Sequence, residues 1–212
     1  MEIKCTNFEL DTKIFQKNEI YGLYDKNSNF INNRFNDIQI MEYNPRTRVK
    51  WYLLSIIPSK RKILKLIKKE FEIDQTIEKK KMGELSSEEL ALTLIAKSFI
   101  TKSKVIILDH IDAFLTMAKF KEIILHIKNI ISHTDKTVIV SANKIDNIIT
   151  TTSNYIIVSE DRIVYNGSNI ESMHEPTEII KFVNTANKKG ANLGYYKDSK
   201  DLLKAIYRSV KK

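Results

Sequence analysis

Three short apolar segments, separated by segments with helical periodicity, constrain the fold of this chain more than any other feature. Val105–Leu108, Thr137–Ser141 and Tyr155–Val158 are predominantly apolar. Such runs are typical of strands that are buried on both faces of a parallel sheet. An amphipathic segment, Met117–Ile131, separates the first two, as a crossover helix does in such sheets. The sequence therefore predicts an α/β fold with a mostly parallel sheet flanked by helices.

Weaker patterns predict the remaining elements. A strand is expected near each of Met1–Cys5 and Glu19–Tyr24, the first within a small antiparallel N-terminal part. Ser86 and Glu89 form a capping box that begins a helix. Further expectations are a helix over Arg61–Phe71, a loop at Lys79–Lys81, a hairpin strand at Arg162–Tyr165, and tail helices around Glu178–Asn184 and Lys200–Ser209. Between residues 30 and 58, Ile38–Tyr43 fits a strand and Arg48–Ile57 a short strand or helix. We expect one domain over residues 1–170, followed by a helical extension over 171–212.

Polar residues follow the predicted central strands. Asp25, Asp109-His110 and Ser141-Ala142-Asn143 stand where three strands end. Ligands of open α/β sheets bind outside the carboxyl ends of the strands. The sequence therefore predicts that any ligand site lies among these residues.

The composition excludes several classes of protein. Only 5 of 212 residues are glycine, and their spacing leaves no glycine-rich phosphate loop and no dinucleotide fingerprint. One cysteine excludes a disulfide framework, and no stretch approaches the ~18 apolar residues of a membrane span. No secretory signal is visible at Met1, so a reducing cytoplasm is expected. The net charge of +9 indicates either an anionic partner or a lysine-rich solvated surface.

An ordered series of segments resembles the ATP-binding subunit of ABC transporters. Glu84–Glu89 stands where that family has its Leu-Ser-Gly-Gly-Gln signature, and Val105–His110 where it has the Walker B strand. Glu19–Tyr24 is similar to the strand that leads into the phosphate loop, Thr137–Asn143 to the switch-histidine strand, and Asp161–Ser168 to the late hairpin. The resemblance covers about residues 1–170 and implies a P-loop NTPase-like sheet with a shortened helical subdomain. The layout is closest to the small bacterial ATPases of peptide or bacteriocin export and immunity.

The same resemblance implies that the chemistry is degenerate. In the phosphate-loop segment, Gly22 and Asn27 match, but Ile31 replaces the lysine, and Asn32 and Asn33 replace the hydroxyl residues. Asp109 retains the magnesium-associated aspartate, whereas His110 replaces the general-base glutamate. Thr116 and Asn143 replace the following aspartate and the switch histidine, and Glu88 and Glu89 place anions where the signature helix would meet a phosphate. Asn27, Ser86, Asp109 and His110 are thus vestigial nucleotide-site candidates. No catalytic or metal-binding residue is expected, and ATP and Mg²⁺ are expected to bind weakly or not at all.

Several functional hypotheses follow. The first is a pseudo-ATPase at the inner face of the cell membrane, a structural or regulatory partner of a membrane permease or of an active ABC ATPase, in a homodimer or heterodimer. The second is residual ATP hydrolysis in a heterodimer to which this chain lends Ser86. The third is a nucleic-acid-binding module that uses Arg46–Tyr52; the alternative there is a solvated face with Trp51 in the core, and nucleic acid is not the expected partner. His126 and His133 are seven residues apart and are expected on one face of a helix, where they are either a metal-binding pair or ordinary surface histidines.

Overall fold

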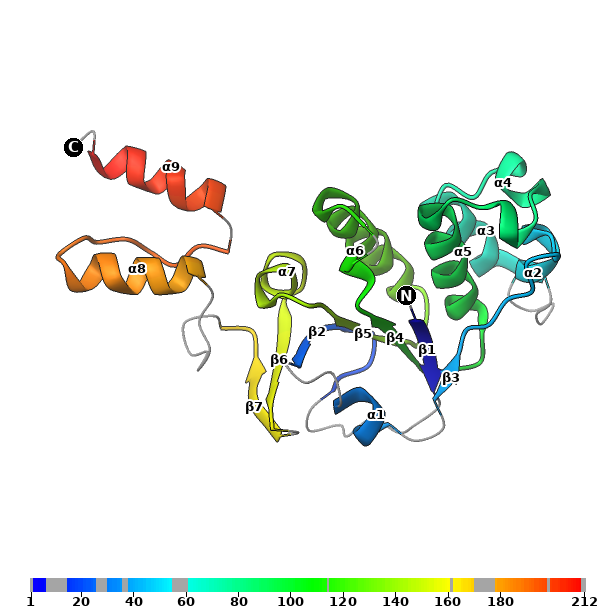
Figure 1. Ribbon diagram of the computed structural model, residues 1–212, viewed down its shortest axis with the longest axis horizontal. Coiled ribbons are helices and arrows are strands. Elements are labelled where there is room, and N and C mark those ends of the chain that lie inside the picture. Colours follow the sequence, from blue (N-terminus) through cyan, green and yellow to red (C-terminus); the bar gives the residue numbers. More distant parts are fainter. Residues whose placement is uncertain are drawn as a thin grey trace.

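One sheet, assembled from segments along most of the chain, organises the structure (Figure 1). The computed structural model describes residues 2–6, 15–25, 30–35, 38–54, 61–113, 115–160, 162–169, 178–197 and 199–210. The strands of these residues are β1 (Glu2–Thr6), β2 (Ile20–Asp25), β3 (Gln39–Ile40), β4 (Val105–Asp109), β5 (Thr137–Ser141), β6 (Asn154–Ser159) and β7 (Arg162–Gly167). They form a seven-stranded sheet in the order β3-β1-β4-β5-β2-β6-β7.

The centre of the sheet is parallel and its margins are antiparallel. β4, β5, β2 and β6 run parallel to one another, whereas β1 pairs antiparallel with both β3 and β4, and β7 pairs antiparallel with β6. The predicted α/β class, the parallel core and the late hairpin are confirmed. The antiparallel N-terminal part is the margin of this same sheet.

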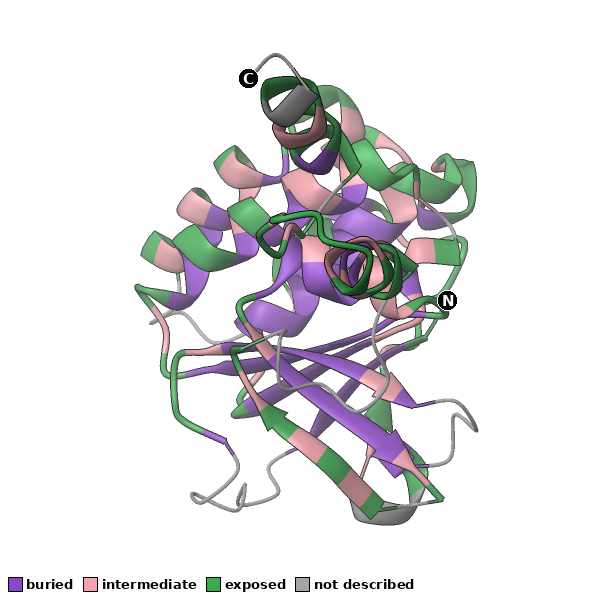
Figure 2. Cartoon of the chain, turned by 90° about the vertical axis from the view of Figure 1, so that its left-hand side faces the viewer, coloured by how far each residue is buried: buried purple, intermediate pink, exposed green. Residues whose placement is uncertain are grey.

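Alternate residues of the central strands enter two different apolar cores. Ile106 and Leu108 of β4 pack with Val138 and Val140 of β5 in the larger core, which helices cover. Their neighbours Val105, Ile107 and Ile139 lie in a second core with Phe30, Ile31 and Phe35. Figure 2 shows that the middle of the sheet is buried throughout. Burial on both faces explains why these strands read as continuous apolar runs.

Helices cover both faces of the sheet. The helices of at least ten residues are α3 (Arg61–Glu70), α5 (Ser87–Ile100), α6 (Met117–Ile131), α8 (Glu178–Lys188) and α9 (Ser199–Val210), as the sequence predicts in each case to within a few residues. The shorter helices are α1 (Phe30–Arg34), α2 (Val49–Leu54), α4 (Gln75–Lys79) and α7 (Ile145–Thr151). In Figure 1, α6 and α7 lie on one side of the sheet and α1 on the other.

The middle of the chain differs most from expectation. The stretch that fits either a short strand or a helix forms the helix α2, and the strand expected over Ile38–Tyr43 is only the two residues of β3. α4 ends at Lys79, the first residue of the expected loop Lys79–Lys81. α2, α3, α4 and α5 gather at one end of the molecule (Figure 1). α5 is buried from Ala91 to Ile100, so other parts of the chain surround this stretch of the helix. This cluster occupies the place of the expected shortened helical subdomain.

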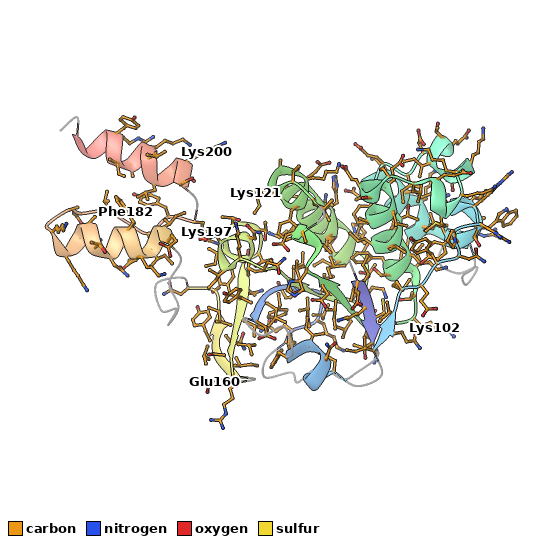
Figure 3. All side chains as sticks on the ribbon, in the orientation of Figure 1. Lys102, Lys121, Glu160, Phe182, Lys197 and Lys200 are labelled. Atoms are coloured by element: carbon orange, nitrogen blue, oxygen red, sulfur yellow. The ribbon has the colours of Figure 1, made fainter. Side chains whose placement is uncertain are left out.

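The C-terminal helices extend from the opposite end of the molecule (Figure 1). α8 is attached through Ile180, which packs in a small core with residues of α7 and β6. Lys197, labelled in Figure 3, donates a hydrogen bond of 2.6 Å to the hydroxyl of Tyr155 in β6. Ile180 and Lys197 are therefore two of the described residues through which this part of the chain contacts the sheet and α7.

Gly22 allows α7 to approach β2 closely. A Cβ atom built at this position would overlap the side chains of Ile148 and Thr152 in and just after α7. Both of those side chains are buried. The glycine that the resemblance assigns to the phosphate loop therefore has a packing role in the strand that precedes it.

We predict that Gly22→Ala destabilises the protein by about 1–3 kcal/mol, because the added methyl group overpacks a buried contact. Gly194→Ala is the matched control, since a Cβ there meets Tyr196 only at an ordinary distance of 3.5 Å. This control should change the stability by no more than about 0.5 kcal/mol. Urea denaturation measures both variants, and equal midpoints would contradict the packing role.

Candidate functional site: a lysine–aspartate centre at the strand ends

The sequence predicts a ligand site at the carboxyl ends of the central strands, which we call the ligand edge of the sheet. Asp109 lies at its centre. Because β4 and β5 are neighbours, Asp109 and Ser141 end side by side, and the Ser141 hydroxyl donates a hydrogen bond of 2.6 Å to Asp109 Oδ1. The backbone N–H of His110 donates in turn to Ser141 Oγ at 2.9 Å. The sequence correctly places these residues at one edge of the sheet.

Lys4 is the residue of this centre that sequence reasoning missed. β1 runs beside β4, and the Lys4 ammonium lies 2.6 Å from Asp109 Oδ2. Two more oxygens surround it, Asn32 Oδ1 at 3.3 Å and Glu2 Oε2 at 3.2 Å. The Lys4 side chain is only 6% exposed. An ammonium has three N–H donors, and each has an oxygen within reach here.

Lys4 and Asp109 each stabilise the charged form of the other. Burial alone raises the pKa of Asp109, but the hydrogen bonds from Lys4 and Ser141 outweigh it and hold this pKa below its ordinary value. Burial likewise lowers the pKa of Lys4, and its contacts with Asp109 and Glu2 more than compensate, so this pKa is raised. Lys4 and Asp109 are therefore both charged at neutral pH.

His110 lies at the rim of the centre. Its backbone φ is +49°, a left-handed conformation that histidine adopts more readily than most side chains. The ring Nε2 lies 3.6 Å from Asp109 Oδ1, which is beyond hydrogen-bond distance. The Asp109 carboxylate instead accepts hydrogen bonds from Lys4 and Ser141.

The described residues of the segment that resembles a phosphate loop make their contacts within the chain. Asn27 lies outside the described residues, as do its neighbours 26, 28 and 29. Next to this gap, the Asp25 carboxylate accepts a hydrogen bond of 2.8 Å from the backbone N–H of Phe30, the first residue of α1. Ile31, at the position of the family's lysine, is 5% exposed and belongs to the second apolar core.

The signature-like segment is also closed by internal contacts. The Ser86 hydroxyl accepts a hydrogen bond from the Glu89 N–H at 3.2 Å, and the Glu89 carboxylate accepts one from the Ser86 N–H at 2.8 Å. Lys80 adds an ion pair of 2.6 Å with Glu89 and, as the largest cause, lowers the pKa of that carboxyl. The capping box predicted from the sequence is confirmed, and Ser86 makes these contacts at the start of α5.

The other two positions implied by the resemblance have structural contacts. Thr116 caps α6, because its Oγ1 accepts a hydrogen bond from the Lys119 N–H at 3.3 Å. The Asn143 N–H donates to Asp112 Oδ2 at 3.3 Å. A pocket of about 310 Å³ lies beside these residues, lined by Asp112, Ala113, Leu115, Met117, Phe120, Asn143, Lys144 and Asn147.

The two histidines considered as a metal pair have separate surroundings. His126 lies in α6, with Nδ1 2.9 Å from Glu70 Oε2 and its ring edge against Phe71. His133 lies in the turn after α6, where Nδ1 is 2.9 Å from the Asn129 carbonyl. They do not share one helix face, so that expectation is wrong. Within the described ranges, no group of three or more histidine, cysteine, aspartate or glutamate residues is placed to hold a metal ion.

We predict that Asp109→Asn destabilises the protein by about 3–5 kcal/mol at neutral pH, because it leaves the buried Lys4 charge with only the exposed Glu2 carboxylate as an ionic partner. The Asp109 pKa is lowered on folding, so its stabilising effect is present above the unfolded-state pKa of about 3.9 and is lost as the pH falls below it. The difference in the free energy of unfolding between wild type and variant should therefore become smaller at acidic pH. Denaturant unfolding at neutral and acidic pH measures it, and a difference independent of pH would contradict the ion pair.

Comparisons with known proteins identify the fold. No known family model matches the chain, and no curated protein matches it by sequence. Among solved structures, it is similar to cbiO1 from Clostridium perfringens, part of the ABC transporter complex cbiONQ, with a TM-score of 0.58 and 17% identity over 88% of this chain and 96% of that one.

Two further structures agree. An ATP-binding cassette of an ABC transporter, in its ADP conformation, matches with a TM-score of 0.58 and 14% identity over 90% of this chain and 100% of that one. A structure of an archaeal ribosome recycling factor with a ribosomal stalk protein matches with a TM-score of 0.54 and 18% identity over 69% of this chain and 33% of that one. At these identities the likeness concerns architecture: the chain has the P-loop NTPase fold of ABC-type ATP-binding cassettes.

Proposed function

We propose that this chain is an ABC-type subunit that keeps the cassette fold without the ATPase chemistry. It acts as a structural or regulatory partner of a membrane permease or of an active ABC ATPase, at the cytoplasmic face of the membrane. None of the helices in the described part of the chain combines the length and apolar character needed to span a bilayer. Peptide or bacteriocin export and immunity is the setting that the sequence resemblance suggests.

The burial of Ile31 carries this proposal. A triphosphate needs a cation and backbone amides at the phosphate loop. Ile31 stands at the lysine position of that loop, and its side chain packs among Phe30, Phe35 and the underside of the sheet. The Phe30 amide already donates to Asp25, whose charge would repel a phosphate. Phosphoryl transfer depends on positioning and electrostatics, both of which these substitutions weaken.

The alternative of residual hydrolysis, with Ser86 lent to a partner's site, receives less support. The hydroxyl and the N–H of Ser86 both lie in the capping box, and Glu88 and Glu89 place carboxylates in the first turn of α5. A partner's triphosphate would have to displace these contacts. This alternative predicts that the wild-type chain raises the ATP turnover of an active partner ATPase when the two are mixed. The Ser86→Ala variant should not raise it.

We predict that millimolar ATP with Mg²⁺ leaves the thermal unfolding midpoint of the isolated protein unchanged, because a ligand stabilises a fold only in proportion to its occupancy of the folded state. Calorimetric titration should show no saturable binding tighter than high micromolar. Tripolyphosphate is the control for the general attraction of polyanions to a chain of charge +9. Binding that prefers ATP to tripolyphosphate and persists at raised salt would contradict the proposal.

A second candidate, the binding of an anionic polymer such as nucleic acid, is favoured by Trp51. The expectation that this residue lies in the core is wrong, since its side chain is 61% exposed on α2. The outward side of the short helix carries Trp51 and Leu54, while Val49, Tyr52 and Leu53 face the core. Lys50 lies 5.8 Å from the Trp51 ring centroid, and Arg46 and Arg48 are exposed nearby in sequence. Exposed aromatic rings beside cations suit the stacking of single-stranded bases.

Trp51 is the only tryptophan of the chain, so its fluorescence reports on this surface alone. If the second candidate is correct, a single-stranded oligonucleotide should quench this emission, and the effect should weaken as salt rises, because released counterions drive such binding. Lys50→Glu should weaken the quenching, whereas Lys188→Glu, at the end of α8, is the charge-matched control. Emission that no oligonucleotide alters at low salt would remove this candidate.

A further inference from the structure

The Lys4 ammonium lies where the fold family would lead one to look for a divalent ion. In the resemblance, Asp109 is the magnesium-associated aspartate and Asn32 stands at a hydroxyl position of the phosphate loop. The Lys4 Nζ lies between these two side chains, 2.6 Å from Asp109 Oδ2 and 3.3 Å from Asn32 Oδ1. It comes from β1, at the antiparallel margin of the sheet, and not from the segment that resembles a phosphate loop.

The residues present do not fit a divalent ion alongside this ammonium. Mg²⁺ binds oxygens at about 2.0–2.1 Å in a near-octahedral shell. Both oxygens of the Asp109 carboxylate already accept hydrogen bonds, Oδ2 from Lys4 and Oδ1 from Ser141. An ion at Asp109 would lie within a few ångströms of a buried positive charge, in surroundings that screen the repulsion poorly. Ion and ammonium therefore exclude each other.

We propose that Lys4 is an internal cation that replaces a divalent metal ion at the strand ends and holds them in one arrangement whether or not metal or nucleotide is present. This inference deepens the proposed function, because a subunit whose site is closed by its own side chain has no metal-dependent state to change. Lys4 connects three elements at once: it belongs to β1, pairs with Asp109 at the end of β4, and contacts Asn32 in α1. Ser141 extends the connection to β5.

The proposal requires that removal of the Lys4 charge creates metal affinity. Lys4→Ala leaves Asp109, Asn32 and Glu2 around an empty volume with uncompensated negative charge. We expect this variant to bind Mn²⁺ roughly a hundredfold more tightly than the wild type, because the buried charge that repels the ion is gone. We also expect Mn²⁺ or Mg²⁺ to raise its unfolding midpoint, as a ligand of the folded state does.

Mn²⁺ without nucleotide is the probe, and its paramagnetism locates the site. Broadening of the His110 ring signals in the NMR spectrum reports an ion at Asp109, whereas broadening of His126 signals reports an ion at the Glu70 and Glu122 carboxylates. The wild type should show no His110 broadening at Mn²⁺ concentrations that broaden these signals in Lys4→Ala. Lys4→Arg, which keeps the charge, should behave as the wild type, and the double variant Lys4→Ala with Asp109→Asn should lose the gained site.

If Lys4→Ala does not fold, Lys4→Gln is the second variant, since it retains a hydrogen-bond donor for Asp109 without the charge. A gain of Mn²⁺ binding at His110 in either variant supports the proposal. His110 broadening in the wild type, or its absence in every folded neutral variant, overturns it. Because no nucleotide is present, this result is separate from the ATP titration: a wild type that binds ATP but not Mn²⁺ would contradict the proposed function and leave the internal cation intact.

Discussion

The buried ion pair between Lys4 and Asp109 is the interaction on which the ligand edge of this fold depends. It joins the first strand of the chain to the strand that ends in the motif-like aspartate, over a sequence separation of 105 residues. Taking both charges out of water is costly, and the hydrogen bonds from Lys4 and Ser141 to the two carboxylate oxygens offset that cost. Glu2 and Asn32 complete the surroundings of the ammonium. The strand ends therefore have a defined electrostatic partner within the chain itself.

Internal contacts of polar groups also occur at the starts of two helices, in the segments that resemble nucleotide-binding motifs. The first amide of α1 is satisfied by Asp25, and the first turn of α5 by Ser86 and Glu89. In each place an oxygen from the chain itself accepts a hydrogen bond from a backbone N–H group near the start of a helix. The sheet and its helices have the fold of the ATP-binding cassettes to which the chain is similar, and these local contacts are made within the chain itself.

Much of the fold follows from local patterns. Val105–Leu108 and its two counterparts are apolar because both of their faces are covered, and this pattern alone predicts a parallel core. α6 begins and ends as its periodicity predicts, and the capping box at Ser86 identifies the start of α5. Ile31 was also readable as a departure from a phosphate-binding pattern, although its place in the apolar core was not. The middle of the chain was less predictable, because helices as short as α2 and α4 contain too few turns to show a periodicity.

What the sequence by itself determined is the class of the fold and the polar residues that follow its central strands, Asp109 among them. What only the tertiary structure decided is which charged group lies beside Asp109, namely Lys4. Lys4 alternates with apolar residues in its strand, a pattern that predicts a solvent-facing lysine. Its face of β1 is covered by α1 and lies beside β4, and both neighbours are distant in sequence. Local periodicity carries no information about such a neighbour, so the partner of a buried charge emerges only when the strands are placed side by side. Trp51 is the opposite case, an apolar residue that lies outside the core. The short helix α2 turns its other side, with Val49, Tyr52 and Leu53, toward the core.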